Sequence, residues 1–474
     1  MKVVHFVNDR ALIHTGVSKA YRMKLKTRRL LFLTLCLLPL AGHGQAIDMN
    51  KVPGIRLDMY PAGGLMWKGE SAQNTNWNKV TETPDGKIWF CGGDHWGTDH
   101  ITGPWSKGES YERPWGFGNT TISYYDPALK KSFVATDEDG NNLELNRSSA
   151  IYSNTETPGH GKSHSNITSD SRGRIYYAGY MGLSYRHEYT RAHYPKSYAG
   201  GALVRYDPAT KDVDYFGVPY PNGGIVGIYY DEKRNIINGI TVDRAKFFRV
   251  NLSTMELNHY ESIARMSRVE DRVREMIMDR DGFCYFANDV GGLTKFDPDK
   301  EMFTDIDITL PGKLMDFRAS VVSSRNIIYA ISTDGFVWSF DPKNHKLEDY
   351  GHIIGMPDQG HYTPNIALDE EWGRLYFMAG NHGGKVLESA LEILTVLDLK
   401  KKKFYWLGQA EGVEGCFGAH VGKDHAVYFS SFGQLFKNNK PVTDKEGKTV
   451  TRPYLIRYEP PANLESFSKV QSGK

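Results

Sequence analysis

Cysteine is scarce in this chain, with four cysteines among 474 residues. Cys36 lies in an apolar stretch near the N-terminus, and Cys91, Cys284 and Cys416 are widely separated. Without Cys36 three cysteines remain, and this odd number at scattered spacing gives neither a disulfide framework nor a zinc-binding pattern. Because Cys91 and Cys284 lie in segments that are typical of strands, we expect both to be buried thiols.

Several short catalytic signatures are also missing. The sequence contains no G-x-S-x-G nucleophile elbow, no H-E-x-x-H zinc motif, no phosphate-binding loop and no dinucleotide-binding fingerprint. A pair of facing acids, which most glycosidases need, is not evident either. Any chemistry must therefore come from side chains that the fold brings together from distant segments.

The first 44 residues are typical of a leader that is removed. Residues 23–29 are basic, residues 30–40 are apolar and too few to span a membrane, and residues 41–44 are small or polar. We expect translation to begin at Met23, residues 1–22 being an over-extended start, and cleavage to fall before Gln45. A signal peptide over residues 23–44 predicts a periplasmic or secreted protein with no membrane span.

Removing this leader changes the charge of the chain. Residues 1–44 hold eight of the 58 Lys and Arg residues and one of the 56 Asp and Glu residues. The remainder has 50 basic and 55 acidic residues, a net charge of −5. This balance argues against a basic nucleic-acid-binding protein, so we expect no nucleic-acid partner.

A short element recurs seven times along the chain. In each copy a turn-forming or small residue is followed, after five or six positions, by an apolar residue and then usually an aromatic one. Internal repetition of this kind is typical of solenoids, propellers and arrays. The residue that opens each copy is, in chain order, Thr83, Asp170, Asp231, Asp279, Ser323, Asp369 and Gly422.

A second element follows each copy: an apolar strand that ends in an aromatic residue, an acid and a proline. Proline presets φ and the acidic side chain bonds the backbone beyond it, so this element starts a turn. A polar strand comes next. The acidic residues are Asp126, Asp207, Asp297, Asp341 and Glu459, and degenerate copies have Asn251 and Asp398 in their place.

Together the two elements describe a unit of four strands that occurs seven times. Units of about 45–60 residues with this content predict an all-β fold, a seven-bladed β-propeller of four-stranded blades, as a single domain over residues 45–474. A pair of β-sandwiches would not explain seven paired copies. We expect an N-terminal strand over residues 55–58 to complete the last blade and close the ring.

Insertions gather at one position of the repeat, between the second and third strands. The two aromatic positions that flank it are 11 residues apart in blades four and five, but 36, 30, 21 and 30 apart in blades one, two, six and seven. This connection emerges on the face where the next inner strand begins. The long loops and the polar segments that directly precede the inner strands, which we call lead-ins, therefore lie together at one mouth of the central channel. The candidate site residues there are His95, Trp96, His164, Tyr180, Arg244, Arg272, Arg274, Arg318, His361, His382 and His420.

A set rich in Arg, His and Tyr suits an anionic ligand. Arg pairs with carboxylates, and His and Tyr transfer protons. Uronate β-elimination needs both, because the carboxylate must be neutralised while the proton on carbon 5 is removed. We expect His164 to be the base, Tyr180 or His95 the acid, and Arg274 and Arg318 the groups that neutralise the carboxylate.

The remaining site residues would contact the saccharide, with the ring of Trp96 stacking on a sugar face. Each residue also has a structural interpretation: histidines that brace loops or link blades, arginines paired with carboxylates in the channel, and a packed Tyr180. No metal site or cofactor is predicted. Residues 136–141 resemble a calcium loop but lack its downstream Glu, so a solvated turn is favoured and Ca²⁺ stays an open alternative.

With these residues in view, the chain resembles the L-rhamnose-α-1,4-D-glucuronate lyases, first described as α-L-rhamnosidases, of polysaccharide lyase family 42. The resemblance rests on the blade pattern and on three segments, residues 92–97, 164–166 and 381–384. It implies a secreted propeller that acts on rhamnose-capped glucuronic acid in arabinogalactan-type glycans, with an acidic oligosaccharide or polysaccharide as its partner.

One departure from this family concerns the opposite face. Some relatives use a single His in the first segment of the mature chain, where this sequence has Gln73. Glutamine cannot act as a base, so a catalytic site on that face would be lost. Two other functions therefore stay open: hydrolytic release of rhamnose, and glycan binding without catalysis.

Overall fold

The computed structural model places part of the chain. It describes residues 54–55, 57–61, 65–66, 71–72, 79–93, 120–143, 163–180, 200–221, 223–241, 246–260, 275–355, 362–380, 392–434, 436–437, 440–441, 443, 447 and 451–468. The expected leader, residues 1–44, lies outside the described residues.

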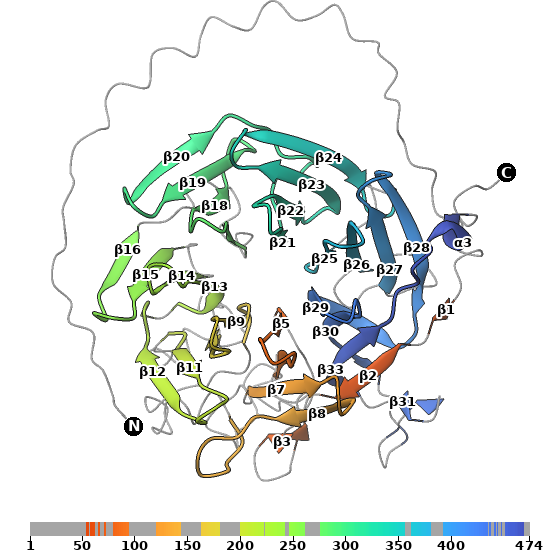
Figure 1. Cartoon of the computed structure of the whole chain (residues 1–474), viewed down its shortest axis with the longest axis horizontal. Coiled ribbons are helices and arrows are strands. Elements are labelled where there is room, and N and C mark those ends of the chain that lie inside the picture. Colours follow the sequence, from red (N-terminus) through yellow and green to blue (C-terminus); the bar gives the residue numbers. More distant parts are fainter. Residues whose placement is uncertain are drawn as a thin grey trace, which may run out of the picture.

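Seven four-stranded antiparallel sheets stand in a ring around a central channel (Figure 1). This confirms the predicted seven-bladed β-propeller. Blade 1 contains β5 (Thr81–Glu82), β6 (Ile88–Gly92), β7 (Thr121–Asp126) and β8 (Lys131–Val134). Blade 2 contains β9 (Thr168–Ser169), β10 (Ile175–Ala178), β11 (Leu203–Tyr206) and β12 (Val213–Gly217). Blade 3 contains β13 (Ile225–Asp231), β14 (Ile236–Thr241), β15 (Phe247–Asn251) and β16 (Leu257–Tyr260).

The remaining blades follow in chain order. Blade 4 contains β17 (Ile277–Met278), β18 (Cys284–Ala287), β19 (Leu293–Asp297) and β20 (Met302–Ile306). Blade 5 contains β21 (Ala319–Val322), β22 (Ile328–Ile331), β23 (Phe336–Asp341) and β24 (Lys346–His352). Blade 6 contains β25 (Ala367–Asp369), β26 (Arg374–Gly380), β27 (Glu392–Asp398) and β28 (Lys403–Ala410). Blade 7 contains β29 (Val413–Val421), β30 (Val427–Gln434), β33 (Thr451–Tyr458) and the N-terminal β2 (Asp58–Pro61).

The ring is closed by strands from both ends of the described chain. β2 pairs antiparallel with β33, and β1 (Gly54–Ile55) adds a fifth, parallel strand to β28 of blade 6. The predicted closure is confirmed, although the outer strand begins three residues later than expected. β2 is therefore the outer strand of blade 7, which joins the N-terminal and C-terminal parts of the described chain in one sheet.

In three of the seven copies, those that open at Thr83, Asp170 and Asp279, the recurring element corresponds to a hydrogen bond within the turn. Tyr176 donates its hydroxyl proton to Asp170 Oδ2 over 3.1 Å, and Tyr285 does the same to Asp279 over 2.9 Å. These aspartates also accept backbone N–H groups of their own turns. In these copies the aromatic residue lies six positions after the turn residue because the two side chains bond each other in the interior.

The acid-proline element forms the turn between the third and outer strands. Asp341 Oδ1 accepts the backbone N–H groups of Lys343 and Asn344 over 2.9 and 3.3 Å. The same geometry recurs at the corresponding residue of other blades: Asp126, Asp207, Asn251, Asp297 and Asp398. Both turn types lie at the same end of their blades.

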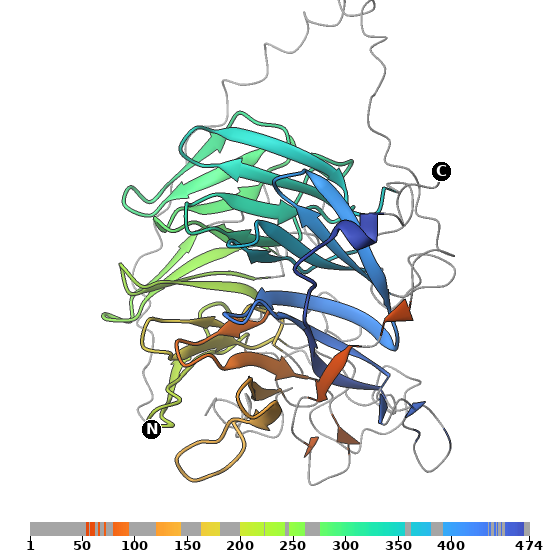
Figure 2. The ribbon, with the colours of Figure 1, turned by 45° about the vertical axis from the view of Figure 1, so that its right-hand side comes forward.

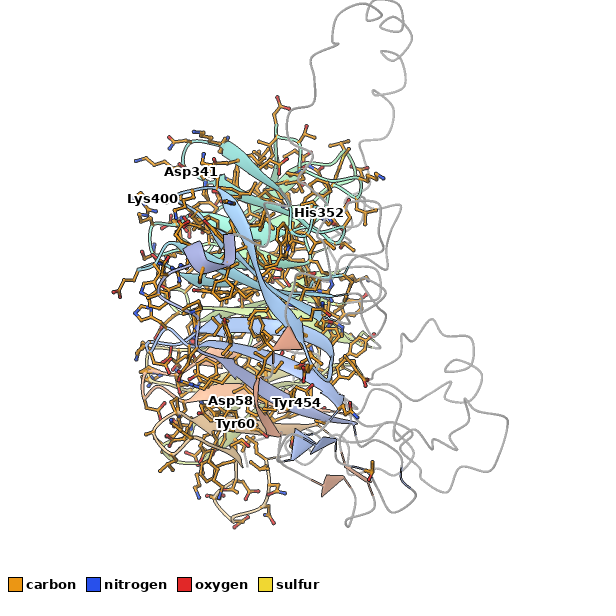
Figure 3. All side chains as sticks on the ribbon, turned by 90° about the vertical axis from the view of Figure 1, so that its right-hand side faces the viewer. Asp58, Tyr60, Asp341, His352, Lys400 and Tyr454 are labelled. Atoms are coloured by element: carbon orange, nitrogen blue, oxygen red, sulfur yellow. The ribbon has the colours of Figure 1, made fainter. Side chains whose placement is uncertain are left out.

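The propeller thus has two different faces. We call the end with both turn types the turn face, and the end where the inner strands begin and the second strands finish the mouth face. Figure 3 shows Asp341 and Lys400 on the turn face and His352 on the mouth face. The turn face is tied from blade to blade, for example by Arg234 Nε to Asp299 Oδ1 over 2.9 Å.

Large apolar and aromatic side chains fill the spaces between blades. Cys91, Cys284 and Cys416 are buried, as predicted for Cys91 and Cys284, and none of the three is in a disulfide bond among the described residues. The short helix α3 (Glu465–Ser468) lies beside β28 on the outside of blade 6 (Figure 2). None of the described helices is long and apolar enough to cross a membrane.

Three small features complete the description. β3 (Leu65–Met66) pairs with β4 (Ser71–Ala72), and β31 (Phe436–Lys437) pairs with β32 (Lys440–Pro441). Residues 136–142 form a turn in which Asp137 Oδ1 accepts the backbone N–H of Asn141 over 2.8 Å. The residues of this turn are mostly exposed, as expected for a solvated turn.

Candidate functional site

The inner strands and their lead-ins enclose a cavity of about 210 Å³ in the central channel. Six blades contribute to its wall, so residues far apart in sequence meet there. The polar lining residues are Lys79, Asn166, Thr168, Tyr229, Ser320, Asn365 and His420.

Part of the polar character of the lead-ins is structural. Asn365 Nδ2 donates to the backbone oxygens of Met378 and Cys416 over 2.9 and 3.2 Å, which ties blade 6 to blade 7. Asn166 Oδ1 accepts the backbone N–H of Ile228 over 2.9 Å, which ties blade 2 to blade 3. These asparagines satisfy backbone groups between blades and are not free to bind a ligand.

A buried charge cluster spans the channel. Lys79 forms an ion pair with Glu275 and donates to the hydroxyl of Tyr229 over 3.1 Å. The Tyr229 hydroxyl and Ser320 Oγ donate in turn to Glu275 Oε1, over 2.8 and 3.1 Å. Glu275 therefore has one cation and two neutral donors as partners.

Burial perturbs the ionisation of this cluster. Loss of hydration lowers the pKa of Lys79, an effect that Glu275 opposes and the nearby positive charge of Arg318 reinforces. Burial and the charge of Glu275 raise the pKa of Tyr229 well above its ordinary value. Tyr229 is therefore a hydrogen-bond donor at neutral pH rather than a base.

Arg318 lies just before β21 and is 5% exposed. Its Nε and Nη2 atoms donate to the hydroxyl of Tyr362 over 2.8 and 2.6 Å, and its guanidinium stacks on the same ring at 5.1 Å. Among the described residues, no carboxylate forms an ion pair with it. Asp316, two residues earlier, is instead bonded by the N–H and hydroxyl of Thr333 over 2.9 and 2.7 Å.

A buried guanidinium without an anionic partner is costly unless a ligand supplies one. Lys79 and Arg318 bring two cations to this region, Glu275 is paired with Lys79, and the Asp316 carboxyl interacts electrostatically with Arg318 without a direct ion pair. A carboxylate ligand could form the close ion pair that Arg318 lacks among the described residues.

His420 contacts the neighbouring blade across the join between the two ends of the ring. Its Nε2 atom lies 3.1 Å from Glu82 Oε2, so the pair joins the inner strands of blades 7 and 1. This contact corresponds to the alternative interpretation of His420 as a link between blades. Its side chain is 32% exposed and still lines the cavity.

His164 and Tyr180, both from blade 2, lie together on the mouth side. Their ring centroids are 5.4 Å apart, and both side chains are buried. The Tyr180 ring belongs to the apolar cluster between blades 2, 3 and 4, and it covers Gly224 so closely that a Cβ there would lie 2.6 Å from its Cε2 atom. Tyr180 thus has an extensive packing role, and its role as an acid stays a prediction.

The other predicted site residues lie outside the described residues. These are His95, Trp96, Arg244, Arg272, Arg274, His361 and His382, together with Gln73. Their roles stay predictions. Among the described residues, no group of three or more His, Cys, Asp or Glu side chains could hold a metal ion.

The sequence did not point to four residues of this region: the cation Lys79, its partners Tyr229 and Glu275, and Tyr362, which bonds Arg318. Lys79, Glu275 and Tyr362 lie in or next to lead-ins that the sequence marked as polar, but nothing showed that they meet. Tyr229 lies within the apolar strand β13, where its sequence context predicts packing. A pairing between residues about 200 positions apart leaves no local signal.

Comparisons with known proteins identify no family. No family model matches the chain, and no curated protein matches it. Among solved structures, the chain is similar to the extracellular domain of a one-component system of B. thetaiotaomicron, with 13% identity and a TM-score of 0.46. That match covers 82% of this chain and 45% of the other, so it spans less than half of that protein.

Two further solved structures are similar at the same level. U3-55K is 9% identical with a TM-score of 0.47, and the match covers 83% of this chain and 97% of that one. The β-propeller domain of Cps50 (Swd1) from Myceliophteria thermophila is 8% identical with a TM-score of 0.46, covering 84% and 99%. Likenesses this distant carry no conclusion about the function of the chain.

Proposed function

We propose that this protein is a secreted or periplasmic enzyme that binds an acidic oligosaccharide at the mouth face and cleaves it beside a uronic acid by β-elimination. Rhamnose-capped glucuronic acid of arabinogalactan-type glycans is the substrate that the sequence resemblance favours. The proposal places the uronate carboxylate at the channel entrance, next to Arg318.

The observation that carries this proposal is the state of Arg318. Its guanidinium is almost fully buried, is oriented by Tyr362, and forms no ion pair with a carboxylate of the described residues. Arginine is suited to a planar carboxylate because it can donate two parallel N–H bonds. Lys79 adds positive charge nearby.

The chemistry follows from neutralising that carboxylate. As a base removes the proton on carbon 5, negative charge spreads into the carboxylate, where a fixed cation stabilises it. The electrons form the double bond between carbons 4 and 5, the bond from carbon 4 to the glycosidic oxygen breaks, and that oxygen takes up a proton. His164 is the proposed base.

Glycan binding without catalysis is the second candidate. The observations that favour it are the occupied partners of Lys79 and His420, which are paired with Glu275 and Glu82. Such pairs rigidify the channel and leave fewer groups for proton transfer. In this case Arg318 would recognise a uronate without any reaction.

The test uses the mature protein, from Gln45 onward, and rhamnose-capped glucuronate oligosaccharides from gum arabic. Released rhamnose and the ultraviolet absorbance of an unsaturated uronate are followed together. Rhamnose with rising absorbance is expected from elimination. Rhamnose without absorbance would identify hydrolysis instead, and binding without either product would identify a glycan-binding protein.

Arg318→Met tests the carboxylate site directly. Loss of a charge-assisted pair costs about 1.5–3 kcal/mol, which is roughly a 10- to 150-fold weaker interaction with the uronate. Arg205→Met is the matched control, because Arg205 binds Asp214 on the outer part of blade 2, away from the channel. Equal uronate affinity in both variants would contradict the proposed site.

A further inference from the structure

Lys79 lines the channel cavity, where the proposed reaction so far uses only its charge. It lies two residues before β5 of blade 1, and its ammonium group reaches Glu275 of blade 4 and the hydroxyl of Tyr229 in β13 of blade 3. Figure 1 shows β5 and β13 in different blades around the central channel. The side chain is 21% exposed, so a group that enters the cavity can reach it.

The cavity has room for part of a substrate next to this ammonium group. Its volume is about 210 Å³, and Lys79, Tyr229 and Ser320 all contribute to its wall. A cavity of about 10–15 Å³ is enough for one water molecule. A glycosidic oxygen with part of its sugar can therefore lie here together with water.

The ammonium group of Lys79 has a donor to offer to such an oxygen. Lysine carries three N–H donors. Contacts among the described residues use two of them, one to Glu275 and one to the Tyr229 hydroxyl over 3.1 Å. The third N–H can therefore be directed to an acceptor in the cavity.

Glu275 does not depend on Lys79 alone for its hydrogen bonds. The hydroxyl groups of Tyr229 and Ser320 donate to its Oε1 atom over 2.8 and 3.1 Å. These neutral donors stay in place if Lys79 gives up a proton, so the buried carboxylate keeps partners. The cluster can therefore accommodate a neutral Lys79 for part of a reaction cycle.

The ammonium group also lies close to the proposed carboxylate site. Ser320, which bonds the partner of Lys79, follows Arg318 by two residues. Loss of hydration lowers the pKa of Lys79, Glu275 opposes this shift, and the charge of Arg318 adds to it. Lys79 is therefore a stronger acid than an ordinary lysine, which favours proton transfer to a substrate.

We propose that Lys79 is the proton donor of the site, giving one ammonium proton to the glycosidic oxygen that leaves carbon 4 of a uronate held by Arg318. This inference rests on the proposed function and assigns the donor to Lys79 rather than to Tyr180 or His95. Lys79 lines the cavity, whereas the Tyr180 ring packs in the apolar cluster between blades.

The step balances without any further reactant. The carbon 5 proton goes to the base, the electrons of that bond form the carbon 4–carbon 5 double bond, and the carbon 4–oxygen bond breaks. The departing oxygen takes a proton from Lys79 and leaves as a hydroxyl group. Lys79 is left as a neutral amine and takes a proton from water before the next turnover.

Lys79→Arg tests the assignment, because arginine keeps the positive charge opposite Glu275 but does not release a proton. Two substrates are compared: the rhamnose-capped glucuronate, and a glucuronate that carries 4-nitrophenolate on carbon 4, which leaves without protonation. The variant is expected to lose about 100-fold or more in turnover of the first substrate and to stay within about threefold on the second. Lys87→Arg is the control and should change neither rate, because Lys87 pairs with Asp85 on the turn face of the same blade.

The wild-type protein provides a test that does not depend on the variant folding. Its rate on the rhamnose-capped substrate should fall with rising pH, as Lys79 loses its proton, at a pH below the ordinary lysine pKa of about 10.4. Its rate on the nitrophenolate substrate should not fall in this way. The other titratable or charged groups around the cavity act on both substrates alike: Glu275, Tyr229, Arg318, His420 and Glu82.

Three results would each overturn the assignment: equal rates for K79R and wild type, equal losses on both substrates, or identical pH profiles for the two substrates. In these cases unsaturated uronate still forms in the wild type, so the proposed function stands and only the donor is wrong. If the wild-type protein forms no unsaturated uronate from either substrate, the proposed function itself is wrong and this inference is overturned with it.

Discussion

Two aspartates at equivalent positions of the propeller differ in one neighbour, and this difference yields a quantitative prediction. Asp170 in blade 2 forms an ion pair with Arg174, Nε to Oδ2, over 2.6 Å. Asp279 in blade 4 has the same tyrosine and backbone donors, but Phe283 replaces the arginine. The pKa of Asp170 is lowered, because its backbone bonds and Arg174 outweigh burial, whereas burial raises the pKa of Asp279.

Arg174→Met converts the blade 2 turn into the blade 4 type. The Asp170 side chain is fully buried, and removing one partner of a buried pair costs about 3–5 kcal/mol. Asp170 keeps the N–H groups of Arg172 and residue 174 and the hydroxyl of Tyr176, so we expect a smaller loss than this, about 2–3 kcal/mol at pH 7. Arg172→Met, an exposed change on the same turn, should cost less than about 0.5 kcal/mol.

The pH dependence gives the sharper test. In the wild type the lowered pKa of Asp170 contributes stability that is present above the unfolded pKa of about 4 and is lost as the pH falls. In the variant the pKa should be raised, as at Asp279, so stability is lost as the pH rises through the folded pKa. The difference between the two proteins should therefore be largest above about pH 5 and shrink toward pH 3.

Reversible denaturant unfolding of wild type, R174M and R172M across this pH range measures the effect. A difference that stays constant with pH would show that Arg174 acts through packing and not through the charge of Asp170. A loss at pH 7 no larger than that of R172M would refute the ion-pair argument altogether.

Three further predictions concern single positions. Gly224→Ala should destabilise the fold by about 2–4 kcal/mol in denaturant unfolding, because the new methyl group meets the Tyr180 ring. A Gly224→Ala, Tyr180→Leu double variant should recover part of this loss. If the two single-variant losses of unfolding free energy simply add, the clash is contradicted. Burial lowers the pKa of His352 to about 4, so the free energy of unfolding should fall as the pH drops from about 6.5 toward 4. His352→Asn should make the free energy of unfolding less dependent on pH in this range. The same pH dependence in both proteins would contradict the lowered pKa. Burial raises the pKa of Glu392, so the wild-type protein loses stability as the pH rises above the unfolded pKa of this group. Glu392→Gln removes the titrating group, and its stability relative to wild type should therefore increase with pH in thermal unfolding. The opposite trend would show that the folded protein stabilises the carboxylate.

The structure explains why the blade pattern could be read from sequence. Asp170 and Tyr176 are six residues apart and bond each other within a single turn, so selection for that bond appears as a local pattern. The acid-proline turns are equally local, because Asp341 bonds only the residues that directly follow it. The position of ring closure was less well predicted, since β2 finds its partner β33 at the far end of the chain.

The candidate site was predicted only in part. Arg318 directly precedes the cavity-lining Ala319 but is not itself part of the lining, whereas His420 lines the cavity while pairing with Glu82. The partner that orients Arg318, Tyr362, and the buried acid Glu392 were not anticipated. Glu392 follows a long insertion and has an ordinary local context, so nothing in the sequence marks it as buried.

The amino-acid sequence by itself determined the number of blades, the order of their strands and the face on which the insertions emerge, because turns and strand alternation depend on residues a few positions apart. Only the tertiary structure decided which charges meet: it paired Lys79 with Glu275, left Arg318 without a carboxylate among the described residues, and buried Glu392 against Gly380. Electrostatic energies depend on distance in space and on the loss of water, and both are set only when the seven blades close into a ring.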